Sequence, residues 1–318
     1  MIEILASGPA NCIHDRGRRG LLHLGVSRSG AMDLLSFDIA NALLGNDPQA
    51  AAIEVAMFPF RLRFETDTSI ALTGADAGAR LDGQKLPPFW VLPVKAGAEL
   101  LLSPPRRGMR AYLGFAGGIA VLPVLGSRST DLKSRFGGFL GRGLAKGDRL
   151  PLGDAAPGKL PQHGLGATLD AATKDFWAGE AGAEPLRIIA AAEYKLFTPQ
   201  ALADFSRADW LVTNEANRMG YRLSGPELTP TRKLELFSHG IVPGTLQVPA
   251  SGQPIIQLAD ANTCGGYPKL AVVIEPDLWK LAQLGPGDRI RFVEANVAEA
   301  LAAFSAQRDM VTRIRAGG

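Results

Sequence analysis

The sequence predicts a mainly β fold, built from two linked β-rich domains with a few short helices. Between residues 52 and 150, short segments alternate apolar and polar side chains or are rich in β-branched residues, as strands are. Turn-forming residues separate these segments at close spacing, and the chain of 318 residues contains 37 glycines and 22 prolines. Many short strands with few long helices favour a barrel or a sandwich. In this half we expect strands at residues 2–5, 21–26, 53–55, 60–64, 69–73, 90–94, 99–102 and 110–116.

Capping residues predict where the helices begin. Asp33 is a suitable N-cap for a short amphipathic helix that ends at Gly45. Thr198 followed by Pro199 predicts the start of a second helix. Other helical segments are expected at residues 171–177, at 276–284, and from an Asn296 cap to about residue 308, with Val297, Leu301 and Phe304 as the apolar side chains of the last. Strands of the second half are expected at residues 186–189, 210–213, 245–248 and 255–258.

The domain organisation is predicted from a change in composition. Residues 153–184 are rich in alanine, glycine and proline and have little periodicity, which is typical of a linker. We therefore expect a first β-barrel domain with an insertion at residues 1–155, a linker at 156–185, and a second β-barrel domain with a C-terminal helix at 186–318. Two pairs of short motifs suggest an internal repeat: GDRL at 147–150 with GDRI at 287–290, and SRSG at 27–30 with NRMG at 217–220.

Composition excludes several classes of function. Hydrophobic residues make up 46% and charged residues 20% of the chain, as in water-soluble globular proteins. The formal net charge of +3 is too balanced to indicate a nucleic-acid or membrane partner. The sequence begins without the pattern of a signal peptide and has no apolar run of the length that spans a membrane, so a cytoplasmic location is expected.

The cysteines and histidines do not form a recognisable metal or disulfide pattern. The two cysteines, Cys12 and Cys264, belong to no CxxC pair, and the four histidines show no ligand spacing. No metal is therefore expected, and His14 and His23 are predicted to lie at the surface. Cys264 precedes a glycine pair, where it could act as a nucleophile only with a nearby base, and His239 is the nearest histidine in sequence.

Residues 238–271 contain the most informative polar pattern. Asp260 and Thr263 come shortly before Gly265 and Gly266, and a tight bend there could aim their side chains into a common cleft. A β-rich connector with ordinary turn residues is the alternative. Elsewhere, Arg28 and Arg128 lie among glycines and hydroxyl side chains, an arrangement that suits carboxylate or phosphate but is also common on solvated loops. No glycine-rich nucleotide-binding motif and no GxSxG motif are present.

Part of this stretch, GTLQVPASGQPIIQLADANTCGGYP, resembles the signature GxIQVPxxGQPIxLxADxxTxGGYP of the allophanate hydrolase subunit 2 family. That family includes KipA, the C subunit of 5-oxoprolinase and the carboxyltransferase domain of urea amidolyase. Further matches extend over nearly the whole chain: SRSGAMDLLSFDIANALLGN, IEVA, AYLGFAGGI, LGSRSTD, GRGLAKGDRL, NRMGYRLSG and LGPGDRIRF. One departure is Cys264, where the motif more often carries threonine.

The resemblance implies two linked barrels of the cyclophilin-like type and the role of the C subunit of a 5-oxoprolinase complex. Such a complex hydrolyses 5-oxo-L-proline to L-glutamate with ATP, and the chain is expected to be inactive alone. The implied partners are a KipI-like subunit (the B subunit of 5-oxoprolinase) and a LamB/YcsF-type subunit (the A subunit of 5-oxoprolinase). Two alternatives are a biotin-dependent carboxyltransferase acting on urea or a similar amide, and a KipA-type regulator that binds a KipI-like kinase inhibitor.

The chain has neither a biotin carboxylase nor a biotin carrier region, which favours the first of these functions. No covalently bound cofactor is then expected; ATP is used by the complex, and biotin is involved only under the carboxyltransferase alternative. Asp260 or His239 would transfer protons, and Tyr267 would donate to the substrate or stack on it. The residues expected to bind substrate are Arg28, Arg128, Arg218, Asn217, Gln247, Gln253, Thr263, Gly265 and Gly266. Asp260 as a turn acceptor, Tyr267 as a core aromatic and Gln253 as a strand-end cap are the structural alternatives.

Overall fold

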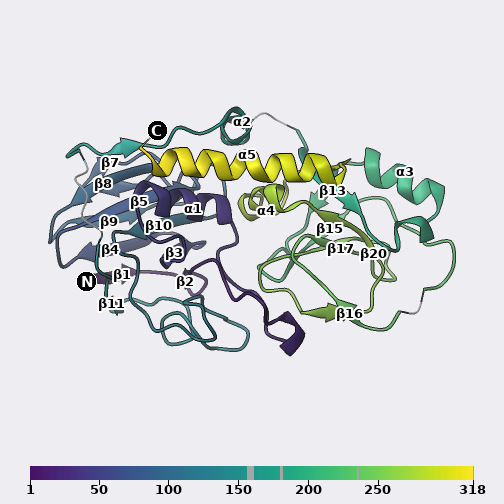
Figure 1. The fold of residues 1–318 in the computed structure, drawn as a ribbon, viewed down its shortest axis with the longest axis horizontal. Coiled ribbons are helices and arrows are strands. Elements are labelled where there is room, and N and C mark those ends of the chain that lie inside the picture. Colours follow the sequence, from purple (N-terminus) through teal and green to yellow (C-terminus); the bar gives the residue numbers. More distant parts are fainter. Residues whose placement is uncertain (156–160, 180–181, 235, 318) are drawn as a thin grey trace. The chain divides into compact units, whose positions relative to one another are not determined.

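Strands dominate the computed structural model, which describes residues 1–155, 161–179, 182–234 and 236–317 (Figure 1). The predicted mainly β class is therefore confirmed. The chain folds into two units. Unit 1 comprises residues 1–18, 29–179 and 308–318, and unit 2 comprises residues 19–28 and 180–307. The predicted boundaries at residues 155 and 186 stay a prediction.

Unit 1 contains two six-stranded sheets. The first has the order β11 (Arg149–Leu150), β1 (Ile2–Ala6), β4 (Phe60–Phe64), β9 (Glu99–Leu102), β6 (Arg80–Leu81) and β7 (Gln84–Lys85). The second has the order β12 (Leu165–Gly166), β8 (Trp90–Val94), β5 (Thr68–Gly74), β10 (Ala111–Phe115), β3 (Ala52–Val55) and β2 (Cys12–His14). In β4, Phe60, Leu62 and Phe64 are buried and alternate with exposed arginines, as the sequence pattern predicts. Phe115 and Leu113 of β10 belong to the same core.

Helix α1 (Leu34–Leu43) packs on β5 and β10 of the second sheet. Asp33 caps it as predicted: its Oδ1 accepts from the Ser36 amide at 2.7 Å, and its Oδ2 accepts from the Ser36 hydroxyl at 2.6 Å. After the helix, the Asn46 side chain donates to the Phe115 carbonyl at 2.8 Å. These contacts fix both ends of the helix against the sheet.

Unit 2 is a closed barrel. Its seven strands are, in order around the barrel, β13 (Glu184–Ala190), β20 (Lys269–Val273), β17 (Thr245–Gln247), β18 (Ile255–Gln257), β15 (Gly220–Ser224), β14 (Trp210–Val212) and β21 (Arg289–Glu294). Parallel pairing of β13 with β21 closes the ring. Phe292 of β21 stacks on Phe205 with ring centroids 4.7 Å apart, and Trp210 is fully buried beside them. Phe205 comes from α3 (Pro199–Arg207), which Thr198 caps as predicted.

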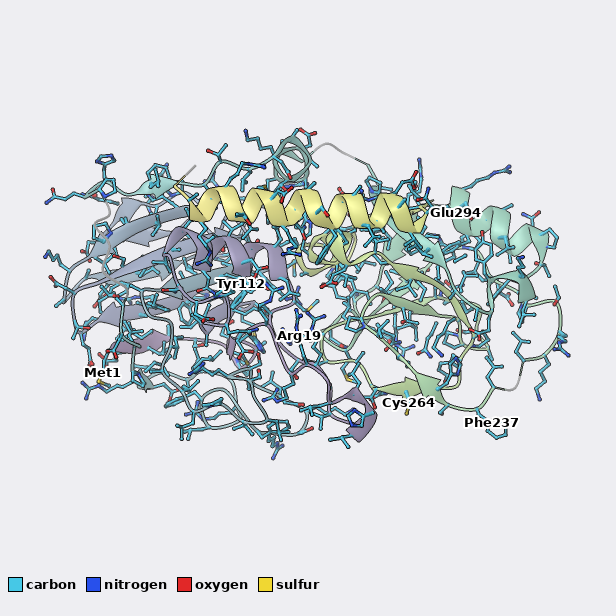
Figure 2. The ribbon with its side chains drawn as sticks, viewed as in Figure 1. Met1, Arg19, Tyr112, Phe237, Cys264 and Glu294 are labelled. Carbon is cyan, nitrogen blue, oxygen red and sulfur yellow. The ribbon has the colours of Figure 1, made fainter. Side chains whose placement is uncertain are left out.

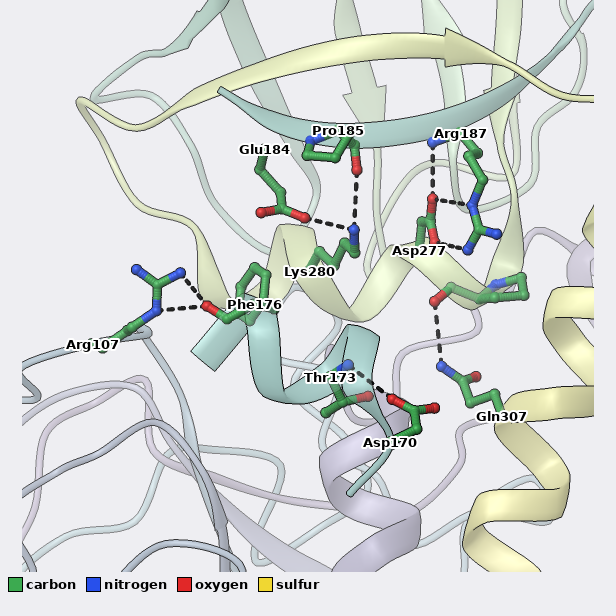
Figure 3. Close-up of polar contacts among 11 residues, drawn as sticks. Arg107, Asp170, Thr173, Phe176, Glu184, Pro185, Arg187, Asp277, Lys280 and Gln307 are labelled. Carbon is green, nitrogen blue, oxygen red and sulfur yellow. Dashed lines mark hydrogen bonds and ion pairs between the residues drawn. The ribbon is translucent and has the colours of Figure 1, made fainter. Parts of the chain in front are cut away.

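Short segments pack around this barrel. They are η2 (Tyr194–Leu196), η3 (Glu275–Asp277), α4 (Leu278–Gln283) and a two-stranded ribbon of β16 (His239–Gly240) and β19 (Cys264–Gly265). Polar contacts attach η3 and α4 to β13 (Figure 3). Asp277 accepts from the Arg187 amide at 2.8 Å and from its guanidinium at 2.6 and 3.0 Å, while Lys280 donates to Glu184 and to the Pro185 carbonyl. This hydrogen bonding with Asp277 raises the pKa of Arg187.

Two more helices complete the fold. Helix α2 (Ala171–Ala178) belongs to unit 1, and Asp170 caps it by accepting from the Thr173 amide at 2.8 Å. The last helix, α5 (Val297–Arg315), begins at Asn296 as predicted but extends beyond residue 308. The prediction of its apolar side was wrong in part, because Val297 and Leu301 are 60% and 61% exposed whereas the buried side chains include Met310 and Ile314. The apolar periodicity that indicates burial lies in the last turns of α5, beyond the predicted end.

Three other local predictions were wrong. Residues 21–26 form a 3-10 turn, η1 (Leu22–Leu24), and not a strand; Gly25 ends it with φ +78°. His14 is buried in β2 and not at the surface, because β2 pairs with the fully buried strand β3, where His14 lies opposite Ala52. The expected helix at 276–284 is divided into η3 and α4, with Asp277 held by Arg187 at the division. In the described ranges, no helix is long and apolar enough to cross a membrane.

One pair of repeated motifs adopts the same turn in both units. Asp148 accepts from the Ala145 amide at 2.8 Å, and Asp288 accepts from the Gly285 amide at 2.7 Å. The preceding glycines have φ of +89° and +96°, and each turn leads directly into a strand. The other pair differs: Gly30 has φ +90°, whereas Gly220 lies in β15 without a positive φ.

Candidate functional site

The most unusual polar side chain of unit 2 lies at the start of β20. Lys269 is only 8% exposed, and its Nζ is buried without a hydrogen-bond partner among the described residues. Burial lowers the pKa of this amine, and the nearby Glu193 carboxylate opposes that shift. Glu193 also accepts a hydrogen bond from the Lys269 backbone amide at 2.9 Å. The lysine side chain and the carboxylate are therefore held in one place.

His239 and Gln247 complete this group. His239, on β16, has its Nε2 3.9 Å from Glu193 Oε1 and its Nδ1 2.9 Å from the Phe237 carbonyl oxygen. Gln247 is buried at the end of β17 and lies opposite Lys269 in the pairing of β17 with β20. We call Glu193, His239, Gln247 and Lys269 the Lys269 cluster. It contains two of the sequence-predicted residues, His239 and Gln247.

The β16–β19 ribbon lies against Gln247. A Cβ atom on Gly265 would be 2.7 Å from Gln247 Nε2, so only glycine fits there without displacing that side chain. A Cβ atom on Gly266 would be 2.8 Å from the Leu236 carbonyl oxygen, so position 266 also requires glycine. Gln247 Nε2 is 3.5 Å from the Tyr267 carbonyl oxygen. The predicted glycine pair thus acts by permitting close approach.

Several exposed side chains accompany this ribbon. Tyr267 is half-exposed and is not the core aromatic of the structural alternative. Phe237 is 97% exposed and, like Cys264, lies along the β16 side of the barrel (Figure 2). Thr263 is partly exposed, and its carbonyl accepts from the Ile241 amide at 3.0 Å.

The pairing of the ribbon argues against a Cys264–His239 pair. His239 lies opposite Gly265, and Gly240 lies opposite Cys264. Residues directly opposite in an antiparallel pair have side chains on one face, and neighbours along a strand alternate. His239 and Cys264 therefore point to opposite faces of the ribbon. His239 is not placed to activate the thiol.

Asp260 and Arg218 form a separate site. Asp260 accepts from Arg218 Nε at 2.8 Å and Nη2 at 3.0 Å, and its backbone amide donates to the Arg218 carbonyl at 3.0 Å. Both side chains are only 11% exposed. Asn217 bonds locally, accepting from the Met219 amide and donating to the Glu215 carbonyl. The Arg218–Asp260 pair joins the loop before β15 to the loop after β18.

Strand register separates the Arg218–Asp260 pair from the Lys269 cluster. Gly220, next to this pair, lies opposite Gln257 at one end of β18. Gln247 lies opposite Ile255 at the other end of β18. The predicted site residues of the barrel therefore divide between the two ends of its short strands.

The remaining predicted residues make backbone contacts or lie elsewhere. Gln253 accepts from the Gly225 amide at 2.9 Å and donates to the Gly225 carbonyl at 3.1 Å, as a strand-end cap does. Arg28 belongs to unit 2 and is partly buried. Arg128 belongs to unit 1, where its Nε donates to the Val121 carbonyl at 2.9 Å.

Sequence reasoning missed Lys269 and Glu193. A signal for Lys269 was present, because a single lysine opens the otherwise apolar segment KLAVV, and a charge there must be buried when the strand joins a sheet. Glu193 had no such signal, since its approach to Lys269 depends on contacts between distant segments. Among the described residues, no group of three or more histidine, cysteine, aspartate or glutamate side chains is arranged to hold a metal ion.

Comparison with known proteins identifies the family. The model of the family described as carboxyltransferase domain, subdomain A and B, matches residues 24–294. The chain belongs to this family. It is 43% identical over 303 residues to the 5-oxoprolinase C subunit of Escherichia coli (strain K12), a match that covers 95% of this chain and 94% of that protein. It is 37% identical to the 5-oxoprolinase C subunit of Haemophilus influenzae, covering 94% and 93% respectively.

Other members of the carboxyltransferase family are much longer than this chain. The urea amidolyase of Saccharomyces cerevisiae is 35% identical over 92% of this chain, which corresponds to 16% of that protein. The crystal structure of the K. lactis urea amidolyase superimposes with a TM-score of 0.89 at 28% identity, covering 98% of this chain and 20% of that one. The Kluyveromyces lactis urea carboxylase gives 0.88 at 30% identity, covering 98% and 29%. This chain thus spans a fifth to a third of these solved structures.

Proposed function

We propose that this chain is the C subunit of a 5-oxoprolinase complex, which hydrolyses 5-oxo-L-proline to L-glutamate with ATP. The observation that carries the proposal is the match to the 5-oxoprolinase C subunit of Escherichia coli, 43% identical over 95% of this chain and 94% of that protein. The two proteins align over almost their whole lengths, so the similarity extends to the whole of that relative and not to one part of it.

The Lys269 cluster supports chemistry at an amide. A lactam or urea substrate presents a carbonyl oxygen and nitrogens, and its conversion requires hydrogen-bond donors and proton transfer at those atoms. Gln247 has an amide donor with only a long contact to the Tyr267 carbonyl, and the three N–H donors of Lys269 bond to none of the residues that the structure describes. The cluster therefore offers N–H groups that can donate hydrogen bonds to a substrate carbonyl.

The two bacterial relatives are each named as one subunit of 5-oxoprolinase, which supports a further part of the proposal: the chain works with other subunits. We propose a KipI-like subunit and a LamB/YcsF-type subunit as these partners, and that the chain alone is inactive. ATP is then used by the complex. The chain itself has no glycine-rich phosphate-binding motif, so a partner would supply the nucleotide site.

A second candidate function is transfer of a carboxyl group from biotin to urea or a similar amide. It is favoured by the name of the family and by the superposition on urea carboxylase, at a TM-score of 0.88. In this case biotin and its carrier would come from another chain. A regulatory function without chemistry has no specific observation in its favour.

The test is co-expression of the chain with the two proposed partners, followed by an assay of ATP-dependent glutamate release from 5-oxo-L-proline. Each of the three chains is omitted in turn. Release that requires all three chains is the expected result. Glutamate release in the absence of this chain would overturn the proposal. So would a complex that carboxylates urea when a biotinylated carrier and bicarbonate are added but does not release glutamate from 5-oxo-L-proline.

A further inference from the structure

Lys269 has no evident structural reason to be where it is. Lysine is almost never fully buried unless it is paired, and this one is 8% exposed with no hydrogen bond to its Nζ in the described part of the chain. A methionine of similar length would fill the same space without the cost of burying an amine. Perturbed, buried titratable groups of this kind concentrate at functional sites.

Two titratable side chains, Glu193 and His239, lie on the same side of the barrel as Lys269. Glu193 is the charged group that acts on the amine, and it is anchored by the Lys269 backbone amide at 2.9 Å. His239 is 3.9 Å from Glu193 and its side chain is 42% exposed. Gln247, opposite Lys269, carries no charge. Glu193 therefore lies near both the buried amine and the partly exposed His239.

We propose that Lys269 exchanges a proton with the amide nitrogen of the substrate, and that Glu193 and His239 connect Lys269 to solvent for the return of that proton. This inference rests on the proposed function insofar as it takes the substrate to be an amide. It assigns to Lys269 a direct contact with the reacting nitrogen, and to Glu193 and His239 a positioning and relay role.

In lactam hydrolysis the proton moves to the substrate. ATP transfers its terminal phosphoryl group to the lactam carbonyl oxygen and leaves as ADP, and a first water adds its oxygen to the carbonyl carbon while losing a proton to solvent. The carbon–nitrogen bond then breaks, and its electron pair goes to the nitrogen, which takes a proton from the Lys269 ammonium. The neutral amine regains a proton from solvent through His239. A second water hydrolyses the acyl phosphate that ring opening leaves, so the products are glutamate, ADP and phosphate.

In carboxyl transfer the same group acts in the opposite direction. The urea nitrogen forms a bond to the carboxyl carbon and loses a proton, which the neutral Lys269 amine accepts. The bond between that carbon and biotin breaks. Its electron pair remains with biotin, which is protonated. Lys269 thus acts as an acid in hydrolysis and as a base in carboxylation. The direction of the pH dependence therefore separates the two reactions.

Substitution in the three-chain complex tests the role. Lys269→Met and Lys269→Arg should both lower kcat roughly 100-fold or more, because neither side chain can exchange the proton, while the KM for 5-oxo-L-proline changes little. Arginine keeps the positive charge, so an active Lys269→Arg complex would show that only charge is needed and would overturn the proposal. Lys195→Met, on the exposed η2 turn near Glu193, is the matched control and should keep full activity.

A chemical rescue keeps the test valid if arginine does not fit. The variant Lys269→Cys is alkylated with bromoethylamine, which gives a lysine analogue with a lower pKa. It is made in a Cys264→Ser background, because Cys264 is the exposed cysteine. Activity should return, and the alkaline limb of the pH–kcat profile should move to lower pH. Rescue without movement of that limb would overturn the proton-transfer role.

Failure of the inference and of the proposed function can be told apart. If the complex carboxylates urea and does not hydrolyse 5-oxo-L-proline, the proposed function is wrong. The Lys269 variants should then still lose activity, and the acidic limb should be the one that moves. A complex that turns over normally with Lys269→Met overturns the inference alone, and a complex active in neither reaction overturns both.

Discussion

At the residue scale, unit 2 buries charge in two different ways. The Asp260 carboxylate receives two hydrogen bonds from the Arg218 guanidinium, at 2.8 and 3.0 Å, with both side chains 11% exposed. The Lys269 amine makes no hydrogen bond to the described residues of the chain. A paired buried charge is stabilised by its partner, whereas one without hydrogen bonds costs stability and so calls for a functional explanation. This contrast makes Lys269 a better candidate for proton transfer than Asp260.

The structural role of Asp260 can be measured by a double-mutant cycle. Asp260→Ala should lower the free energy of unfolding by roughly 3–5 kcal/mol, because it removes the carboxylate that faces the buried guanidinium. Adding Arg218→Met should restore part of that loss, since no buried charge then remains in the pair. Urea denaturation followed by tryptophan fluorescence measures these changes, in variants where Trp90 and Trp177 of unit 1 are replaced by phenylalanine so that the signal comes from unit 2.

The control for this cycle is the exposed Arg222–Glu215 pair, whose side chains are 55% and 71% exposed. Glu215→Ala should cost no more than about 1 kcal/mol. Additive effects of Asp260→Ala and Arg218→Met would contradict a structural pairing. Loss of activity in Asp260→Ala should therefore be compared with its stability before a catalytic role is assigned.

The sequence indicated the residue types of this region but not their partners. Arg218 and Asp260 are 42 positions apart, and no local pattern specifies that their side chains meet. The same is true of Glu193 and Lys269, which come together because η2 and β20 are neighbours in the barrel. Gln253 was foreseen in its alternative role as a strand-end cap, since that contact depends on nearby turn chemistry.

At the scale of elements, the β16–β19 ribbon controls the position of Gln247. Gly265→Ala would place a Cβ atom 2.7 Å from Gln247 Nε2 and 2.8 Å from Ile241 Cδ1. Because both atoms are the far ends of flexible side chains, the substitution should cost little stability but should displace the Gln247 amide, so activity of the complex should fall. Measured kcat/KM and melting temperature of the variant complex check this expectation.

Gly240→Ala is the matched control on the same ribbon, because a Cβ atom there meets no atom within 4 Å. It should leave both kcat/KM and melting temperature close to those of the unaltered complex. If Gly240→Ala is as harmful as Gly265→Ala, then general flexibility of the ribbon, and not the contact with Gln247, is what matters.

Elements with strong local signals were predicted well. Alternation located strands such as β4 and β9 to the residue, and caps at Asp33 and Thr198 located α1 and α3. Prediction failed where apolar residues do not become buried. The leucines of residues 21–26 look like a strand, yet glycines at 20 and 25, with φ of +77° and +78°, leave room only for a short turn.

At the scale of the whole chain, long-range pairing decides the organisation. Closure of the barrel depends on parallel pairing of β13 with β21, about a hundred residues apart in sequence, and residues 308–318 belong to unit 1 although they follow unit 2. Neither feature has a local signal. The family resemblance supplied the barrel of unit 2, which periodicity left open between barrel and sandwich, whereas the strands of unit 1 form two six-stranded sheets.

The length of the relatives leads to a last prediction, about biotin. The match covers 94% of the 5-oxoprolinase C subunit of Escherichia coli but only 16% of the yeast urea amidolyase, and the hydrolysis proposed for the complex passes no group through biotin. Avidin, which captures biotin, should leave glutamate release by the complex unchanged. Avidin already saturated with biotin is the control. Inhibition by free avidin and not by saturated avidin would contradict the hydrolase assignment and favour carboxyl transfer, because only that reaction passes its carboxyl group through biotin.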